Sequence, residues 1–196
     1  MESENWHRGN YLVSTDPELL QVEAVNAALG SDMVWWAGDL PEAALREALN
    51  KSLCFGLYDT SAIQASTESS EIESSSSEWV SGKSPTPFLA KLNYTDRSSP
   101  LLKQIGLVRV ITDNVTFAYL TDVYILDGHQ GAGLGRWILE IVNGKLQSWP
   151  NLRRVILLTT DKMSFFNKHL GMKDYNEFDG MKGVSIAMVE GPGAQH

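Results

Sequence analysis

A glycine-rich turn, Gly131-Ala132-Gly133-Leu134-Gly135, joins two stretches of sequence with different periodicity. Before the turn, residues 116–126 are rich in β-branched, aromatic and apolar side chains, which is typical of a strand. After it, apolar residues recur at helical spacing up to Pro150. Glycines leave backbone N–H groups accessible, and here these groups would stand at the positive end of a helix dipole. The turn therefore predicts an α/β chain that binds a phosphate where the strand meets the helix.

The spacing of the glycines excludes two common phosphate-binding motifs. The dinucleotide pattern G-x-G-x-x-G requires a third glycine, but the chain has Arg136 or Ile138 there, depending on which glycine starts the count. The P-loop pattern, counted from Gly128, requires a lysine where the chain has Leu134. If the glycine turn binds a phosphate, it must belong to a different class of phosphate-binding motif.

The rest of the chain alternates between strand and helix signals. A first helix is predicted from Asp16 as N-cap and Pro17 at the first helical position to Leu29, and a second helix begins at Pro41. Further helices are predicted after Leu134 and over Met163–Leu170. Strands are predicted over residues 10–14, 53–58, 104–111, 116–126, 155–159 and 184–189. This order predicts a mixed α/β sheet with helices beside it.

The length of 196 residues fits one domain covering 1–196. One segment interrupts it, because Ser61 to Ser84 holds ten serines and four glutamates in 24 residues. Such a segment buries too little apolar surface to offset the entropy of ordering it. We expect a mobile, dispensable insertion at about 61–100.

Charge and cysteine content exclude several function classes. The formal net charge of −8 repels phosphate backbones, so nucleic acid is not expected as a partner. No apolar run reaches the roughly 18 residues that cross a bilayer, and no secretory signal is visible, so a cytoplasmic protein without membrane contact is expected. Cys54 is the single cysteine and is predicted to be a core residue of a strand. The four histidines lack metal-ligand spacing, so no metal is expected.

The turn fits a third pattern, Gln130-x-x-Gly133-x-Gly135, which resembles the Q/R-x-x-G-x-G/A motif of the GNAT superfamily of N-acetyltransferases. A second phrase, residues 165–172 (FFNKHLGM), is similar to the F-Y-x-K-x-G-F phrase that follows in that family and is one residue longer. The resemblance covers most of the chain outside 61–100. It implies a mostly antiparallel sheet flanked by helices, with a V-shaped splay between the strands that hold acetyl-CoA.

The resemblance also implies which residues bind the donor. The pyrophosphate would lie on the backbone amides of Gln130, Gly131, Ala132, Gly133, Leu134 and Gly135, and the pantetheine arm along Val123, Tyr124 and Ile125. Asn167 is a further candidate for cofactor binding, and Arg136 either adds charge at a phosphate or is simply solvated. A strand N–H near Tyr124 or Ile125 would stabilise the oxyanion that forms on the thioester.

An amine acceptor must lose a proton before it attacks the thioester, because its pKa is about 10.4. Asp122 is the first candidate for the base and Asp113 the second, and Asp122 as a structural carboxylate stays open. Phe166 stands where many GNAT enzymes carry a tyrosine that protonates the leaving thiolate, which leaves Tyr124, Tyr119, Tyr175 or water for that role. The expected acceptor site contains Trp35, Trp36 and Asp122.

The function predicted from these features is transfer of acetyl from acetyl-CoA to a primary amine of a small molecule, by direct attack in a ternary complex. Two alternatives stay open: a peptide or protein N-acetyltransferase, and a non-catalytic acyl-CoA-binding module. The expected assembly is a monomer or a homodimer.

Overall fold

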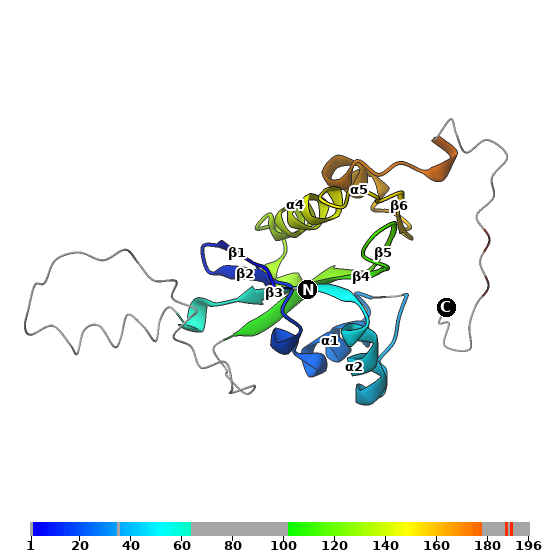
Figure 1. Ribbon diagram of the computed structural model, residues 1–196. Helices are drawn as coiled ribbons and strands as arrows, with labels where there is room; N and C mark the ends of the chain where they lie inside the picture. The colour runs from blue at the N-terminus through cyan, green and yellow to red at the C-terminus, as the bar shows by residue number, and fades with distance from the viewer. Residues whose placement is uncertain (1, 35, 64–101, 178–186, 188, 190–196) are drawn as a thin grey trace, which may run out of the picture.

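Apolar runs build the centre of a six-stranded sheet in the computed structural model, which describes residues 2–34, 36–63, 102–177, 187 and 189 (Figure 1). The strands follow one another in chain order: β1 (Asn5–Arg8), β2 (Tyr11–Ser14), β3 (Leu53–Asp59), β4 (Lys103–Thr112), β5 (Phe117–Ile125) and β6 (Arg154–Leu157). All neighbours pair antiparallel except β5 and β6, which are parallel. The expected mixed, mostly antiparallel sheet is confirmed.

Helices cover both faces of this sheet, which explains why the middle of β3 is buried throughout. Helices α1 (Val22–Leu29) and α2 (Glu42–Asn50) lie on one face, and α4 (Leu134–Gln147) and α5 (Met163–Leu170) on the other (Figure 1). Among the described residues, the 3₁₀ helices η1 (Pro17–Leu19) and η3 (Asp127–His129) lie in connections, and η4 (Tyr175–Glu177) follows α5.

Two apolar clusters hold the helices to the sheet. The larger one packs α4 and Phe166 of α5 against β3, β4 and β5. The smaller one packs α1 and α2 against Cys54, Leu107 and Tyr124. Cys54 is only 5% exposed, so its predicted place in the core is confirmed. Burial raises the pKa of its thiol to about 12.

The predicted helix ends are confirmed at three residues, whereas the prediction of one continuous first helix is wrong. Asp16 caps residue 18 through its side chain, Gly30 ends α1, and Gly171 ends α5 in the left-handed conformation. The helix predicted from Pro17 to Leu29 is instead broken, because Leu20 is extended between η1 and α1. Gln21 causes the break: its N–H donates to the Gln104 side chain at 2.8 Å and its own amide to the Leu102 carbonyl at 2.6 Å.

Two strands also differ from the prediction. Strand β1 was not expected, because four residues (NWHR) carry too little alternation to indicate a strand without its partner. Strand β6 is shifted towards the N-terminus by comparison with the predicted 155–159, and its residues are exposed or partly exposed.

Two predicted segments lie wholly or partly outside the described residues. Most of the insertion, 64–101, is outside them, while 61–63 form a helical turn and Ile63 is 8% exposed. Ile63, near the start of the segment, is therefore a buried apolar residue, and the mobility and dispensability of the insertion stay predictions. Of the predicted strand over 184–189, only residues 187 and 189 are described; neither is in a strand, and Val189 is 94% exposed.

Over the described residues, none of the helices has the length and apolar character needed to cross a membrane.

Candidate functional site

Strands β5 and β6, the last two in the order of the described sheet, separate part-way along β5. Their pairing runs only from Phe117 with Arg154 to Leu120 with Leu157, and β5 continues to Ile125 after β6 has ended. Leu126 donates its N–H to the Ile105 carbonyl on the β4 side at 2.9 Å. Because strand residues alternate, the N–H groups of Val123 and Ile125 face the side from which β6 has departed. The splay thus leaves the second half of β5 with an edge that no described strand pairs with.

The glycine turn lies directly beyond this edge. Gly131 and Gly133 have φ angles of 81° and 72°, in the left-handed region where glycine is favoured. Gly133 is the N-cap of the 14-residue helix α4, and no side chain caps that end. The first N–H groups of α4 therefore point out of the helix with its positive dipole end behind them, which is the geometry of an anion site.

Side-chain contacts hold the turn against the strand. Gln130 donates its side-chain amide to the Ile125 carbonyl at 2.8 Å and to the Asp127 carboxylate at 2.9 Å. A Cβ on Gly135 would already be 3.4 Å from Phe165 and 3.6 Å from Ile125, so this glycine allows α4 to approach the strand closely. Leu134 is 1% exposed and anchors the first turn of α4 in the core. The predicted donor-binding residues of the strand and the turn are therefore neighbours in the fold.

Arg8 on β1 is a residue of this site that the sequence analysis missed. Its guanidinium donates to the Ala132 carbonyl at 2.7 Å and to the Gly133 carbonyl at 3.4 Å, and it lies 5.3 Å from the centre of the Trp137 ring. A cation beside a helix N-terminus is unfavourable unless an anion is also bound there. No local signal could have identified Arg8, because 124 residues separate it from Ala132.

Two other predicted donor-site side chains have partners within the protein. Arg136 bonds Glu140 one turn further along α4, with 2.6 Å between its Nε and the carboxylate oxygen, and its side chain is 66% exposed. Asn167 donates its side-chain amide to the Met172 carbonyl at 2.7 Å, after the end of α5. Asn167 thus stabilises the chain reversal at Gly171.

Asp122 is buried and in contact with Arg109. The Nε of Arg109 lies 2.6 Å from one carboxylate oxygen, and the other oxygen accepts a hydrogen bond from the Thr121 hydroxyl at 3.2 Å. Of the two roles that the sequence left open for Asp122, these contacts favour the structural one. Asp113 is also engaged, since it accepts hydrogen bonds from the Thr116 hydroxyl and from the N–H groups of residues 115–117, which lower its pKa.

Tyr124 follows on the same strand and is 6% exposed, on the face covered by α1 and α2. Burial is the main reason that its pKa is raised, with the Asp122 charge second, so the phenol keeps its proton at neutral pH. Phe166, in the place of the tyrosine of similar enzymes, is 8% exposed and packs in the core. In the loop between α1 and α2, Trp36 is 38% exposed, whereas Trp35 lies outside the described residues.

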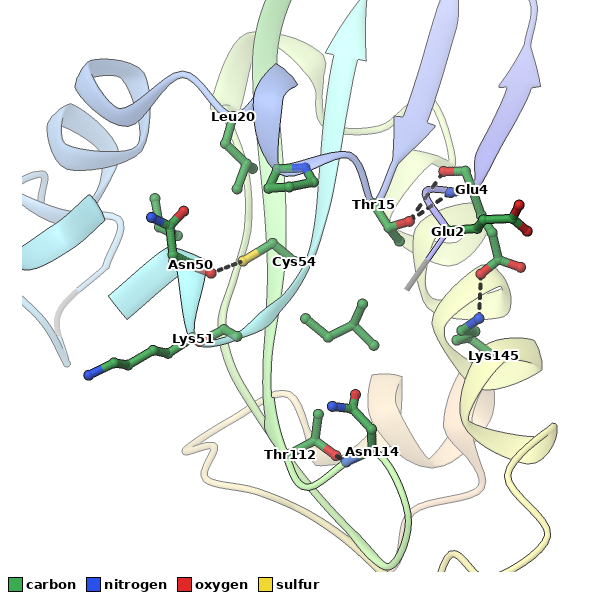
Figure 2. Close-up of a pocket in the computed structure, with 14 residues that line it drawn as sticks. Glu2, Glu4, Thr15, Leu20, Asn50, Lys51, Cys54, Thr112, Asn114 and Lys145 are labelled. Carbon is green, nitrogen blue, oxygen red and sulfur yellow. Dashed lines mark hydrogen bonds and ion pairs between the residues drawn. The ribbon is translucent and has the colours of Figure 1, made fainter. Parts of the chain in front are cut away.

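A cavity of about 250 Å³ lies at the opposite end of the sheet (Figure 2). Its walls include the ion pair of Glu4 with Lys145 and the Cys54 thiol, which is 3.7 Å from the Leu49 carbonyl. Thr112 of the β4–β5 hairpin also lines it. Strand β5 runs from this hairpin to the glycine turn, and the predicted site residues are absent from the cavity wall.

Among the described residues, no three histidine, cysteine, aspartate or glutamate side chains are grouped so that they could hold a metal ion.

Comparison with known proteins gives a consistent result. The chain is 60% identical over 193 residues to a protein of Gibberella zeae that carries the provisional description of an acetyltransferase, with 98% of this chain and 96% of that protein covered. A crystal structure from Xanthomonas campestris pv. campestris, ascribed to the GNAT acetyltransferase family, is 26% identical with a TM-score of 0.58, covering 91% of this chain and 93% of that one.

A GNAT-family acetyltransferase from Streptococcus pneumoniae TIGR4 shares the fold, with a TM-score of 0.52 at 15% identity over 92% of this chain and 98% of that one. A scan against models of known protein families finds no match.

Proposed function

This chain belongs to the GNAT family of acetyltransferases, and on that premise we propose that it transfers acetyl from acetyl-CoA to the primary amine of a small molecule. One observation carries the proposal: the uncapped N-terminus of α4 lies directly beyond the unpaired edge of β5. These two features offer amides for a diphosphate and for an extended amide-containing chain, the two parts of CoA that lead to the thioester.

On the donor side, the N–H groups from Gln130 to Gly135 receive the pyrophosphate. The pantetheine arm extends the sheet along Val123 and Ile125, because amide groups pair with an unpaired strand edge as another strand would. Arg8 supplies a positive charge beside the turn. The side chains of Asn167 and Arg136 already bond the Met172 carbonyl and Glu140, and a direct contact with the donor would break these bonds. We therefore expect both residues to contribute only through the shape and charge of the neighbouring helices.

In the chemical step the acceptor amine attacks the thioester carbonyl directly, and a β5 amide donates to the oxygen on which negative charge develops. The proton of the ammonium group leaves to water, because the carboxylates of Asp113 and Asp122 are both committed to other partners. Tyr124 keeps its proton at neutral pH, and because burial makes it a weaker acid, it is a candidate to stabilise the departing thiolate by donating a hydrogen bond rather than by giving up its proton. A thiolate is also a tolerable leaving group without help, since the pKa of a thiol is only about 8.5.

On the acceptor side, a small amine is favoured by the formal net charge of −8, which attracts an ammonium group. Trp36 in the loop between α1 and α2 offers an indole to a cationic or apolar group.

The first test is thermal denaturation with acetyl-CoA, and with NAD and ATP as controls. A ligand at 100 times its Kd adds about 2.7 kcal/mol to stability, which corresponds to a rise in Tm of roughly 5–10 °C for a chain of this size. Only the CoA esters should produce this rise. Absence of a shift with any CoA ester would refute the donor assignment.

The second test is release of free CoA thiol with panels of small amines and of peptides. Turnover with a small amine supports the proposal. Turnover with peptides alone would instead identify a peptide or protein acetyltransferase, and tight CoA binding without turnover on either panel would identify a binding module.

A further inference from the structure

Strand β5 contains one residue more than β4 at the point where it leaves β6. Arg109 pairs with Thr121 and Leu107 pairs with Tyr124, so one β4 residue stands opposite two β5 residues. The extra residue is Asp122, whose φ of 49° is in the left-handed region. This is a β-bulge, which bends a strand and redirects the groups that follow it. The accessible N–H groups of Val123 and Ile125 are the groups that follow.

The bulge is held by a buried ion pair rather than by a glycine. Arg109 Nε lies 2.6 Å from Asp122 Oδ2, and the two side chains are only 18% and 6% exposed. Arg109 stands directly opposite Thr121, the residue before the bulge, so the pair joins β4 to β5 at this point. Its Nη1 also donates to the Ser52 hydroxyl at 3.4 Å. A buried pair of this kind tolerates little displacement, because moving either group leaves the other charge buried and unpaired.

The same contacts make Asp122 a poor general base. Protonation would remove the negative charge that pairs with Arg109, whose guanidinium would then lie largely buried without a counter-charge.

We propose that Arg109 and Asp122 are positioning residues that lock the β5 bulge and so set the direction of the N–H groups of Val123 and Ile125, one of which donates to the thioester carbonyl of the donor while the other pairs with the pantetheine arm. This inference rests on the proposed function. It assigns no proton transfer to Asp122.

The test combines two variants that break the lock with one that preserves its shape. Asp122→Ala and Arg109→Met remove one partner each, and we expect kcat for thiol release to fall by roughly 10- to 100-fold, as for a small displacement of a catalytic group. Asp122→Asn keeps an oxygen for Arg109, and asparagine tolerates the left-handed region. It should therefore retain most of kcat, with a pH profile like that of the wild type.

A second readout does not depend on turnover. The acetyl carbonyl exists in acetyl-CoA but not in free CoA, so the bulge amides should give the wild type a preference for acetyl-CoA in calorimetric titrations. This preference should disappear in Asp122→Ala and Arg109→Met and survive in Asp122→Asn. The wild type is titrated with both acetyl-CoA and free CoA. If it binds neither ligand, the donor assignment itself is refuted. If it binds the two equally, only the role of the bulge is overturned.

The control for backbone strain is Asn114→Ala. Asn114 has a φ of 61° in the exposed β4–β5 turn, at the other end of β5, so this change should lower Tm without altering kcat or the acetyl-CoA preference. If a single variant unfolds, the double variant Arg109→Met/Asp122→Ala, which leaves no unpaired charge, keeps the test decisive and should show the same kcat loss.

Two results would overturn the proposal. A large kcat loss in Asp122→Asn that recovers at high pH would identify Asp122 as the base. Normal kcat and normal acetyl-CoA preference in the variants that break the pair would show that the bulge needs no lock.

Discussion

Replacing Gly133 by valine perturbs the donor site at a residue whose backbone lies in the left-handed region. Gly133 has φ 72° and ψ 16° and is the N-cap of α4. The left-handed conformation costs an L-residue about 1–2 kcal/mol, and a β-branched side chain is among the least tolerant of it. A Cβ at this position would be 3.5 Å from Arg8 Nη2, so the methyl groups beyond it would press on the guanidinium that bonds the turn.

These effects together amount to about 2 kcal/mol, at the upper end of the range for the backbone alone. If the variant stays folded with the turn strained, Tm should fall by roughly 4–8 °C. If the turn relaxes, its N–H groups no longer converge on the pyrophosphate, and 2 kcal/mol corresponds to an acetyl-CoA Kd raised by about 30-fold. If the turn is only strained, the valine side chain still stands where the pyrophosphate must approach the backbone amides, so in both cases donor binding should weaken more than the chemical step.

The assay is calorimetric titration with acetyl-CoA together with thermal denaturation, and the matched control is Gly128→Val. Gly128 lies in η3, near the same turn, but its φ is outside the left-handed region and a Cβ there would meet no atom within 4 Å. The control should bind acetyl-CoA like the wild type. A folded Gly133→Val protein with wild-type affinity would refute the assignment of the turn to the donor phosphates.

Three further predictions concern single side chains. Arg8→Met should weaken acetyl-CoA binding by about 3- to 10-fold, as an exposed cationic contact worth about 1 kcal/mol implies, and should reduce its salt dependence, whereas Arg46→Met on the outer side of α2 should do neither. The pKa of Asp113 is lowered chiefly by the Thr116 hydroxyl, so its stabilising effect is present above the unfolded pKa of about 3.9 and is lost as the pH falls below it. The urea midpoint of Asp113→Asn should therefore lie below that of the wild type at pH 7, and the gap should narrow at pH 2–3; a gap independent of pH would contradict this. Cys54, whose pKa is raised to about 12 by burial, should resist alkylation at pH 8 until the chain is unfolded in urea, and rapid labelling of the native protein would show that the thiol is accessible.

Features that depend on neighbours along the chain could be predicted from the amino-acid pattern alone. Glycine spacing placed the turn at 131–135, because a left-handed backbone and close helix packing restrict the residue at single positions. The spacing of apolar residues predicted β3, β4, β5 and the two helices after them, because the buried side of a strand or helix repeats at a fixed interval along the sequence. The helix-capping residues Asp16 and Gly171 could also be predicted, because capping depends on residues that are close in sequence.

Other features of the site were decided only when the chain closed on itself. Arg8 reaches the glycine turn because β1 joins the sheet through β2, and the helix predicted from Pro17 breaks because Gln21 bonds residues beside it in space but far away in sequence. The role of Asp122 depended on the pairing of β4 with β5. Because β5 has one residue more than β4 at this point, the Asp122 carboxylate is the partner of Arg109. Such a register shift cannot be detected from hydrophobic periodicity. Composition and spacing express what each segment prefers, whereas hydrogen bonds across strands and buried charge pairs exist only between groups that the tertiary fold has brought within about 3 Å of each other.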